Sequence, residues 1–558
     1  MNAKKTKVKQ SDATINEPQS SFFENDKFVF LLLGIAVLIV FIARMHLLSF
    51  PFERDEGEYA YFGKLILDCH APYTLAYNMK LPGTYYMYAM IMAIFGESIL
   101  GVHIGLTIIS LASMILVFLI SKNFASKLGA VIAATSFGVI GTSWTLLAQA
   151  AHATHFVIFY ALLGTFVLLQ LYKSKKYTLI RYFLSGVLFS LAFICKQSGL
   201  FFMFFGFTII LVKEFNVKNF SFIKNLALYL AGFVFPIISM LLYFYFFADF
   251  DKFWFWTVSY LLKYGDQIPL SSAYTMFKTS IGSITGNYTS AGYFALWLLS
   301  LLAIPFLYIN KTTFQTKIII ISFFVFSFLT VVPGFYFRSH YFITLLPAMA
   351  ILIATLFDTI NTFAIEKLKV PGLAYLNLFI FIMFLGSGIK ANADYLFKRK
   401  PEVSCKKIYG SNPFVESIKV AKFLEKNTTK DDKIAVLGSE PQICFYANRY
   451  SASGYIYTYN LVEIHSYALE MQKEMIKEIE TSKPKYIVIV TVATSWLTRP
   501  DSERLIFNWA DAYLAKNYKN VGILDIYPNK ISQFVTGEKL VGYAPQSQEG
   551  IIVFERNQ

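Results

Sequence analysis

The sequence predicts a polytopic α-helical membrane protein that ends in a small α/β domain. Its 558 residues are 56% hydrophobic and 18% aromatic, with a mean hydropathy of +0.51. Only 15% of them are charged, whereas soluble proteins carry about 25%. Long apolar runs dominate residues 28–390, and beyond that point the charge rises and the long runs stop.

The formal net charge of +15 is explained by topology rather than by a nucleic-acid partner. The lysines fall in short loops between apolar runs, which is the pattern of the positive-inside rule. We therefore exclude nucleic acid as a partner.

The chain divides into three predicted parts. Residues 1–26 are polar and contain four early lysines, so we expect a disordered cytoplasmic tail. The apolar run 28–48 has the length of a membrane span and no small-residue cleavage site after it, so we expect an uncleaved first helix with the N-terminus inside. A transmembrane catalytic domain then covers residues 27–390, and an extracytoplasmic α/β domain covers residues 391–558.

Hydropathy predicts about eleven spans, together with short helices at the membrane interface. After the first span, the others lie at roughly 98–121, 127–147, 153–172, 182–195, 199–213, 225–248, 291–309, 318–336, 341–360 and 373–390. Residues 55–68 are predicted to form a short amphipathic helix. The apolar stretch 84–95 is too short to span, which favours an interfacial or re-entrant segment.

The loop lysines orient these spans. With the N-terminus inside, the lysine-bearing loops are cytoplasmic, and they lie at 121–127, 173–181, 213–224, 310–317 and 361–372. The outward loops hold nearly all the loop acids, and an odd number of spans places everything after Lys390 outside. One outward loop, 249–290, is rich in Trp, Tyr and Ser. It is either an aromatic interface belt or a lid over a lipid or sugar.

The last 168 residues alternate strand-like and helical patterns, which indicates a small α/β domain. The predicted strands are 433–438, 485–492, 520–527 and 550–555, and the predicted helices are 413–426, 461–482 and 502–517. We find no catalytic constellation in this domain. Two of the four cysteines, Cys405 and Cys444, fall in it, and their spacing leaves open whether they are paired or free.

The loop from Phe50 to Tyr85 carries the strongest functional signal. Three carboxylates, Asp55, Glu56 and Glu58, stand near its start and Lys80 near its end, with apolar sequence on both sides. Charges held at a membrane surface are costly, so such a cluster is a candidate site. A simpler interpretation accounts for two of the acids: Asp55 as a helix N-cap with Glu58 at the third helical position.

Lys80 and Arg338 share an unusual position. Each comes just before an apolar helical segment that begins on the outer face, where a cation is unfavourable unless an anion lies between the cation and the helix start. The alternative is that both side chains extend to lipid headgroups. Together with the acid cluster, they favour a bound phosphate.

A carboxylate beside a phosphate pocket at the outer membrane surface indicates one reaction. A sugar linked through phosphate to a polyprenol has a good leaving group once cations neutralise it, so the reaction needs one base for the acceptor hydroxyl. Asp55 is the predicted base, with Lys80 and Arg338 stabilising the departing phosphate. A single displacement inverts the anomeric centre.

These residues resemble a known family. The chain is similar to bacterial GT-C glycosyltransferases of the protein-O-mannosyltransferase and aminoarabinose (lipid A) transferase type. The resemblance covers roughly residues 28–390 and rests on Arg54-Asp55-Glu56 with Tyr59-Ala60, Lys80-Leu81-Pro82, Lys196-Gln197-Ser198-Gly199 and Arg338-Ser339-His340-Tyr341.

The resemblance implies Asp55 as catalytic base with Glu56 as its acidic neighbour. It implies donor-phosphate contacts from Lys80 and Arg338, and from His340 and Lys196 as further candidates. It also implies a polyprenyl-phosphate-linked sugar donor, a lipid, glycan or protein acceptor, and a place in the bacterial cytoplasmic membrane.

The chain departs from the family in its second outer loop. Relatives often carry an acid near the position of Thr154, whereas this chain reads AQAAHATHF, with His152 and His155 three residues apart. That spacing allows a shared metal, although polar packing at a helix start is the commoner role. We expect no cofactor requirement; a divalent metal is allowed but not indicated.

A lipid or glycolipid transporter, or flippase, is the alternative function. Such proteins tend to place charges near the bilayer midplane and to contain internal repeats. Here the charges cluster at the outer ends of spans, and we find no clear repeat. A structural scaffold with a sensory C-terminal domain leaves the acid cluster unexplained. The transferase is therefore the favoured prediction, with its sugar and acceptor unspecified.

Overall fold

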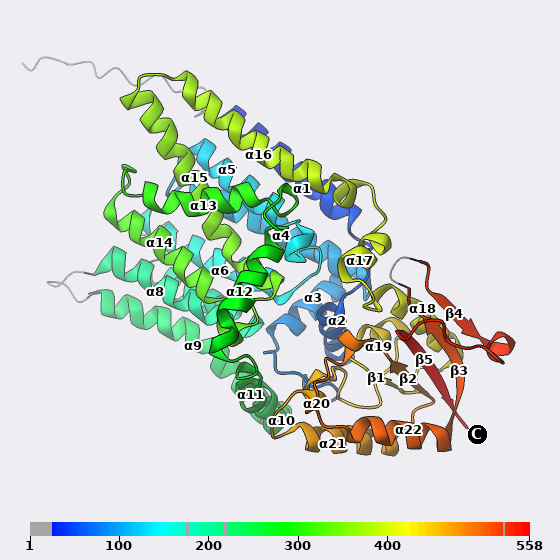
Figure 1. Cartoon of the computed structure of the whole chain (residues 1–558). Coiled ribbons are helices and arrows are strands. Elements are labelled where there is room, and N and C mark those ends of the chain that lie inside the picture. Colours follow the sequence, from blue (N-terminus) through cyan, green and yellow to red (C-terminus); the bar gives the residue numbers. More distant parts are fainter. Residues whose placement is uncertain (1–24, 174–177, 216–220, 528–529, 558) are drawn as a thin grey trace, which may run out of the picture.

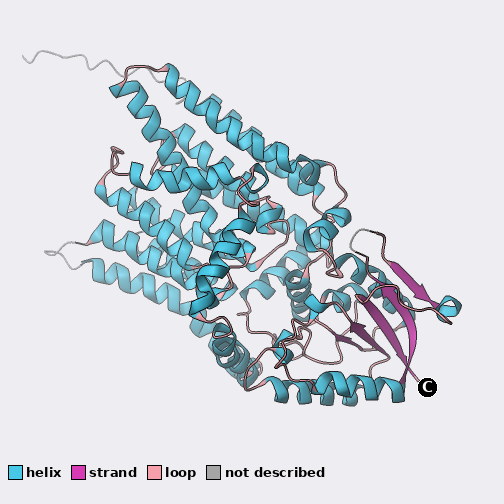
Figure 2. Ribbon diagram, viewed as in Figure 1, coloured by secondary structure: helices cyan, strands magenta, loops and turns pink. Residues whose placement is uncertain are grey.

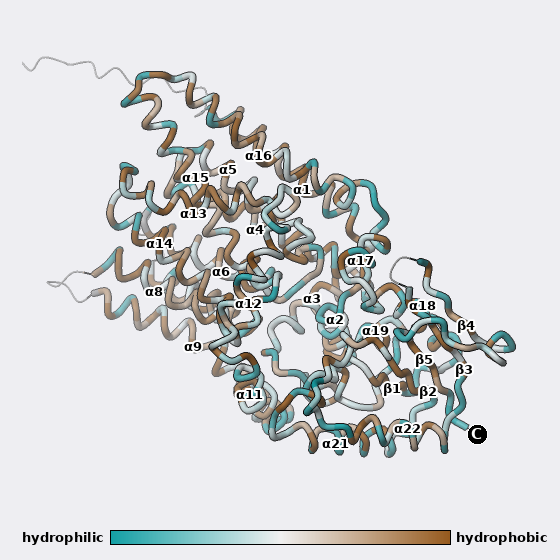
Figure 3. Tube along the Cα trace, viewed as in Figure 1, coloured by the Kyte–Doolittle hydropathy of each residue, from teal (hydrophilic) through white to brown (hydrophobic). Residues whose placement is uncertain are grey.

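In the computed structural model, a bundle of long helices packs against a smaller α/β domain (Figures 1 and 2). The structure describes residues 25–173, 178–215, 221–527 and 530–557. Most of the predicted tail, 1–24, and parts of two predicted cytoplasmic loops, 174–177 and 216–220, therefore lie outside the described residues. Hydrophobic residues concentrate along the long helices, and hydrophilic ones gather in the C-terminal domain and at the junction (Figure 3).

The first half of the chain contributes the helices that frame the junction. They are α1 (Asp26–His46), α2 (Arg54–Leu67), α3 (Gly83–Phe95), α4 (Ile99–Ser121), α5 (Lys127–Ile140), α6 (Ala153–Leu169), α7 (Thr178–Cys195), α8 (Leu200–Glu214) and α9 (Ser221–Phe247). The predicted amphipathic helix is α2, and the predicted short apolar segment is α3. Both lie at the junction with the C-terminal domain rather than within the stack of long helices (Figure 1).

The second half of the helical part begins with the segment predicted as an aromatic outer loop. Most of that segment is helical: α10 (Phe250–Trp254), a π-helical turn at Phe255–Tyr260, α11 (Leu261–Gly265) and α12 (Leu270–Ile284). The remaining helices are α13 (Phe294–Phe306), α14 (Phe314–Leu329), a 3-10 segment at Ser339–Leu345, α15 (Leu346–Thr362) and α16 (Gly372–Phe397). Helix α16 continues seven residues past the domain boundary predicted at 390.

Seven stretches of the described helices are long and apolar enough to cross a membrane, and the chain is an integral membrane protein. They correspond to seven of the predicted spans. The other four predicted spans are α5, α6, α13 and α14, which are apolar but only 13 to 17 residues long. The total of eleven spans stays a prediction.

The C-terminal domain is a five-stranded mixed sheet with helices around it. Its helices are α17 (Pro401–Tyr409), α18 (Phe414–Asn427), α19 (Gln442–Ala447), α20 (Tyr459–Val462), α21 (Ala468–Ser482) and α22 (Leu505–Asn517). Its strands are β1 (Ile434–Leu437), β2 (Tyr486–Val490), β3 (Tyr518–Asp525), β4 (Gln533–Thr536) and β5 (Gly550–Arg556).

The strand order is β1-β2-β5-β3-β4, with β1 and β2 parallel and the other pairs antiparallel. All four predicted strands are present, and β4 is an additional edge strand. The predicted helix at 461–482 begins only at Ala468, after the single turn α20. Cys405 and Cys444 are separate buried thiols, so the structure favours the unpaired alternative.

One buried apolar cluster runs from α1 through the long helices to strand β5, so the two halves share a core. Helix α19 of the C-terminal domain packs directly on α2. The contact is close at Gly57, where an added Cβ would lie 2.7 Å from the backbone nitrogen of Gln442. The start of α2, which carries the predicted catalytic acid, is therefore fixed between the helical bundle and the C-terminal domain.

Candidate active site

Helix α2 begins with a capping box, but one made by other residues than predicted. The N-cap is Glu53, whose side chain accepts the backbone N–H of Glu56 at 3.0 Å, while the Glu56 carboxylate accepts the N–H of Glu53 at 3.4 Å. The prediction that Asp55 caps the helix with Glu58 at the third position is therefore wrong. The chain is already extended at Glu53, so the helix starts earlier, and Asp55 and Glu58 keep their carboxylates for other partners.

Those partners converge on Lys80. Its Nζ lies 3.0 Å from Asp55 Oδ1 and 2.7 Å from Glu58 Oε2, and it stands 4.6 Å from the centre of the Tyr59 ring. The Tyr457 hydroxyl donates to Asp55 Oδ1 at 3.2 Å. Asp55 Oδ2 has no such partner among the described residues apart from His340 Nε2 at 4.0 Å, so this oxygen is available to a substrate.

The two acids are held at different pKa values. Burial acts to raise the pKa of Asp55, but the Lys80 ammonium outweighs it and holds that pKa well below its usual range. For Glu58, which has no exposed surface, burial prevails and raises the pKa to about 7 against the opposing effect of Lys80. At neutral pH, Asp55 is ionised and Glu58 is near its titration midpoint.

Glu56 does not face the same space. Its Oε1 accepts the backbone N–H of Ala151 at 2.6 Å and contacts His103 Nε2 at 2.9 Å, and the side chain is wholly buried. The carboxylate thereby ties the start of α2 to the loop before α6. The structure gives this predicted catalytic residue the position of a support for the site.

The other two predicted cations, Arg338 and Lys196, both lie beside the 3-10 segment at Ser339–Leu345. Arg338 is the N-cap of the 3-10 segment at Ser339–Leu345, and its guanidinium lies 5.4 Å from the centre of the Tyr336 ring. The Lys196 ammonium lies 3.3 Å from the centre of the Tyr341 ring, and burial lowers the pKa of Lys196 to about 7. Within the described parts of the chain, neither cation has a carboxylate within 4.0 Å.

A possible cation site lies beside Asp55. The rings of His152 and His340 stack with centroids 3.9 Å apart, and the ligand atoms of Asp55, His152 and His340 lie within 4.8 Å of one another. Both nitrogens of His152 and Nδ1 of His340 are buried, with no hydrogen-bond partner in the part of the chain that the structure describes. One carboxylate and two imidazoles suit zinc or a similar divalent ion, so these residues fit such a metal.

The histidine pair suggested by sequence spacing is not the one that the fold assembles. His155 is buried on α6 and is not part of the cluster, whereas His340 lies on a segment 188 positions after His152. Spacing along one helix could not reveal this partner.

The C-terminal domain supplies one wall of the site, which the sequence analysis missed. Tyr457 and Tyr459 carry hydroxyls toward the start of α2, and Asn460 has a buried Oδ1 without a partner among the described residues. The aromatic run YIYTY at 455–459 is the one signal that could have pointed here.

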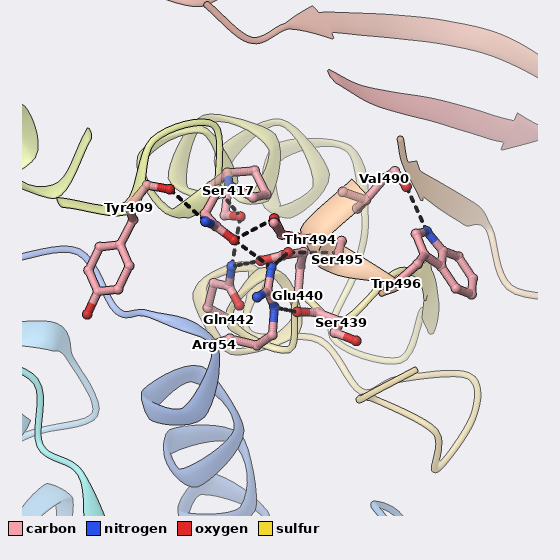
Figure 4. A network of polar contacts seen from close by, with 12 residues as sticks. Arg54, Tyr409, Ser417, Ser439, Glu440, Gln442, Val490, Thr494, Ser495 and Trp496 are labelled. Atoms are coloured by element: carbon pink, nitrogen blue, oxygen red, sulfur yellow. Dashed lines mark hydrogen bonds and ion pairs between the residues drawn. The ribbon is translucent and has the colours of Figure 1, made fainter. Parts of the chain in front are cut away.

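Arg54 joins this wall to α2 through a buried network (Figure 4). Its guanidinium donates to Glu440 Oε1 at 2.5 Å, to the Ser439 carbonyl at 2.5 Å, to the Tyr459 hydroxyl at 2.7 Å and to Asn412 Oδ1 at 3.1 Å. Residues 438–440, which match no phosphate loop, therefore anchor the residue next to Asp55.

Both carboxylate oxygens of Glu440 accept hydrogen bonds. Its Oε1 also accepts from the Ser495 hydroxyl at 2.8 Å, and its Oε2 accepts from the Gln442 amide at 2.6 Å (Figure 4). A buried ion pair whose carboxylate oxygens are both hydrogen-bonded fixes geometry, and loss of one partner is costly.

The two walls enclose a cavity of about 730 Å³. Its helical wall includes Asp55, Lys80, His152, Arg338 and His340, and its other wall includes Asn412, Tyr457, Tyr459, Asn460, Glu463 and Arg499. Tyr260, Tyr264 and Tyr336 close a third side. Of the six predicted site residues, four line this cavity; Glu56 and Lys196 lie behind its wall.

Comparison with solved structures identifies the fold. The Archaeoglobus fulgidus oligosaccharyltransferase, in complex with zinc and sulfate, aligns over 90% of this chain and 73% of its own, with a TM-score of 0.56 and 14% identity. AglB from the same organism, in complex with an inhibitory peptide and a dolichol-phosphate, aligns over 95% and 76%, with a TM-score of 0.53 and 12% identity.

ArnT from Cupriavidus metallidurans, bound to undecaprenyl phosphate, aligns over 95% of this chain and 98% of its own, with a TM-score of 0.54 and 12% identity. No protein-family model and no curated protein sequence matches the chain. The chain therefore shares the overall fold of these three proteins, with long apolar helices followed by a C-terminal sheet domain, as the sequence predicts.

Proposed function

We propose that this protein is a membrane glycosyltransferase that moves a sugar from a polyprenyl-phosphate donor to an acceptor hydroxyl. The observation that carries the proposal is Asp55, an ionised carboxylate with one open oxygen, which pairs with Lys80 in a cavity that Arg338 also lines. The neighbours of similar fold are described as oligosaccharyltransferases, or as bound to dolichol-phosphate or undecaprenyl phosphate, which supports this class of donor.

The proposed step is a single displacement. The acceptor hydroxyl gives its proton to Asp55 Oδ2 while its oxygen attacks the anomeric carbon. The bond from that carbon to the phosphate oxygen breaks, and the polyprenyl phosphate leaves with the electron pair. Lys80 and Arg338 stabilise the charge on the leaving phosphate, and attack from the opposite face inverts the anomeric centre.

The supporting residues have distinct proposed roles. Tyr457 and Lys80 orient Asp55 through its Oδ1, and Glu56 holds the loop before α6. Lys196 acts through Tyr341, on whose ring it stacks, and His340 lies beside the open oxygen of Asp55. The cations supply the charge that the leaving group needs, so we propose a transfer that requires no metal, although Asp55, His152 and His340 could hold one.

The placement of the protein is also a proposal. The lysine-bearing loops favour an N-terminus in the cytoplasm and a C-terminal domain outside, so the cavity would open at the extracytoplasmic face of a bacterial cytoplasmic membrane. The acceptor would then be an envelope lipid, glycan or protein.

The test is sugar transfer by the full-length protein in membranes supplied with radiolabelled polyprenyl-phosphate sugars. Asp55→Asn keeps the size of the side chain but removes the base, so we expect transfer to fall by about 10²–10⁴-fold. Asp68→Asn, at the other end of α2 and outside the cavity, should retain activity. Transfer by Asp55→Asn near the wild-type rate would refute the base assignment; no transfer by any form, with movement of intact glycolipid across the membrane, would establish the transporter alternative.

A further inference from the structure

Lys80 is placed between two carboxylates of one helix turn. Asp55 Oδ1 and Glu58 Oε2 both accept from its ammonium, so this group of three carries one excess negative charge when all are ionised. An ammonium has three N–H donors, and two are used here. The third has no hydrogen-bond acceptor among the described residues, although the centre of the Tyr59 ring lies 4.6 Å from Nζ, and an anion that accepts from it also meets the excess negative charge.

Glu58 is the carboxylate whose protonation can remove this excess negative charge. Asp55 retains an open oxygen toward the cavity, whereas Glu58 has no exposed surface and lines no part of the cavity. Its Oε1 accepts from the Tyr85 hydroxyl at 2.8 Å. A neutral Glu58 would place its proton on Oε1, toward the Tyr85 oxygen, and would continue to accept from Lys80 through Oε2.

We propose that Glu58 takes up a proton from solvent when a phosphate binds to Lys80, so that phosphate binding and proton binding are coupled. The proposal rests on the phosphate site of the proposed function and adds a positioning residue to it. Protonation leaves Asp55 as the one ionised partner of Lys80 among the described residues, so the group of three becomes neutral and no longer repels the phosphate. The base stays ionised throughout.

The groups around Glu58 are the other places where a proton could bind. The charged and titratable groups that face it from α2, from the loop before α3, from α3 and from the C-terminal domain are Asp55, Tyr59, Tyr73, Lys80, Tyr85 and Tyr457. Glu58 itself is near its titration midpoint at neutral pH, since burial raises its pKa to about 7. Outside this group, Lys196 has a pKa of about 7 because of burial and could also take up a proton when an anion binds.

The experiment is calorimetric binding of farnesyl methyl phosphate to the purified full-length protein in detergent. This phosphodiester keeps one negative charge from pH 5 to pH 9, so any pH dependence belongs to the protein. Titrations at pH 8 in buffers of different ionisation enthalpy count the protons taken up. We expect about one for the wild type, and a Kd that is flat below about pH 7 and rises up to about tenfold per pH unit above it, because the protonated form binds better.

Glu58→Gln mimics the protonated acid. It should bind as tightly at pH 8 as the wild type does at pH 6, with a proton uptake near zero. Tyr85→Phe removes a donor that stabilises the carboxylate, so the pH at which binding weakens should move upward. Lys196→Met should leave the proton uptake unchanged.

The outcomes separate the two proposals. Proton uptake that persists in Glu58→Gln and disappears in Lys196→Met overturns the role of Glu58 and leaves the phosphate site intact. Uptake near zero in the wild type, with normal binding, also overturns it. If the wild type does not bind the phosphodiester at any pH, the phosphate site of the proposed function is refuted together with this coupling.

Discussion

The two main walls of the cavity differ in chemistry and in how the fold supplies them. The helical wall carries the acid and the two cations of the proposed reaction, Asp55, Lys80 and Arg338, in or near the first turns of helices. The wall from the C-terminal domain is largely made of phenols and amides, such as Tyr457, Tyr459 and Asn460. In the proposed function, the first wall removes a proton and holds a phosphate. The second orients the first and presents hydrogen-bonding groups to whatever lies between them.

The largest expected effect comes from breaking the link between these walls. Glu440→Leu leaves the buried Arg54 guanidinium without its counterion, so we expect the free energy of unfolding to fall by about 3–5 kcal/mol. Thermal unfolding of the purified protein in detergent measures this. Glu470→Gln, which removes an exposed pair with Lys473, is the control and should change little. Equal stability of the two variants would mean that the walls are held together without Arg54.

The next effect tests the charged wall. Arg338→Met keeps the packing of the side chain against Tyr336 but removes the positive charge that stabilises the leaving phosphate in the proposed reaction. We expect transfer to fall by about 10²–10³-fold, with the thermal midpoint unchanged. Tyr308→Phe, a change on a tyrosine that is 90% exposed far from the cavity, should leave the rate unchanged. A rate for Arg338→Met within twofold of the wild type would remove Arg338 from the phosphate site.

A smaller effect tests the aromatic wall. Tyr457→Phe deletes one hydrogen bond to Asp55 Oδ1 and leaves the ion pair with Lys80 in place. We expect transfer to fall by less than about tenfold, and the acid limb of its pH profile to move upward because the carboxylate loses a donor. If instead Tyr457→Phe matched Asp55→Asn, the C-terminal domain would carry chemistry rather than orientation.

The smallest expected effect concerns metal. If the cations of the helical wall supply the charge, chelation with EDTA should change transfer by less than twofold. A loss that zinc or manganese restores would contradict this, and it would assign the ion to Asp55, His152 and His340. His155→Ala, which lies outside that cluster, distinguishes specific ligation from a general effect on α6.

The places of Asp55, Lys80 and Arg338 could be recognised from the sequence because each residue has a local signature. Acids beside an apolar run, or a cation just before a helix, are unfavourable on their own, so their presence indicates a partner. The pattern and length of apolar runs predicted α2, α3 and four of the five strands. They missed β4, a four-residue edge strand whose pairing with β3 is a long-range contact.

The wall from the C-terminal domain could not be predicted because its role depends on contacts between segments that are distant in the sequence. Arg54 and Glu440 are 386 positions apart, and nothing near either residue marks the pair. The same holds for the stack of His152 on His340. The helix cap was predicted two residues late, since Asp55 and Glu58 fit the spacing of a capping box as well as Glu53 and Glu56 do; the extended backbone at Glu53 decides between them.

The most direct test of the account is a cryo-electron microscopy map of the full-length protein in nanodiscs with undecaprenyl phosphate. We expect phosphate density in the cavity within hydrogen-bond reach of Lys80 and Arg338, with Asp55 adjacent and the lipid tail leaving along the helical bundle. Phosphate density elsewhere on the molecule, with the cavity empty, would contradict the assignment of this cavity as the donor site.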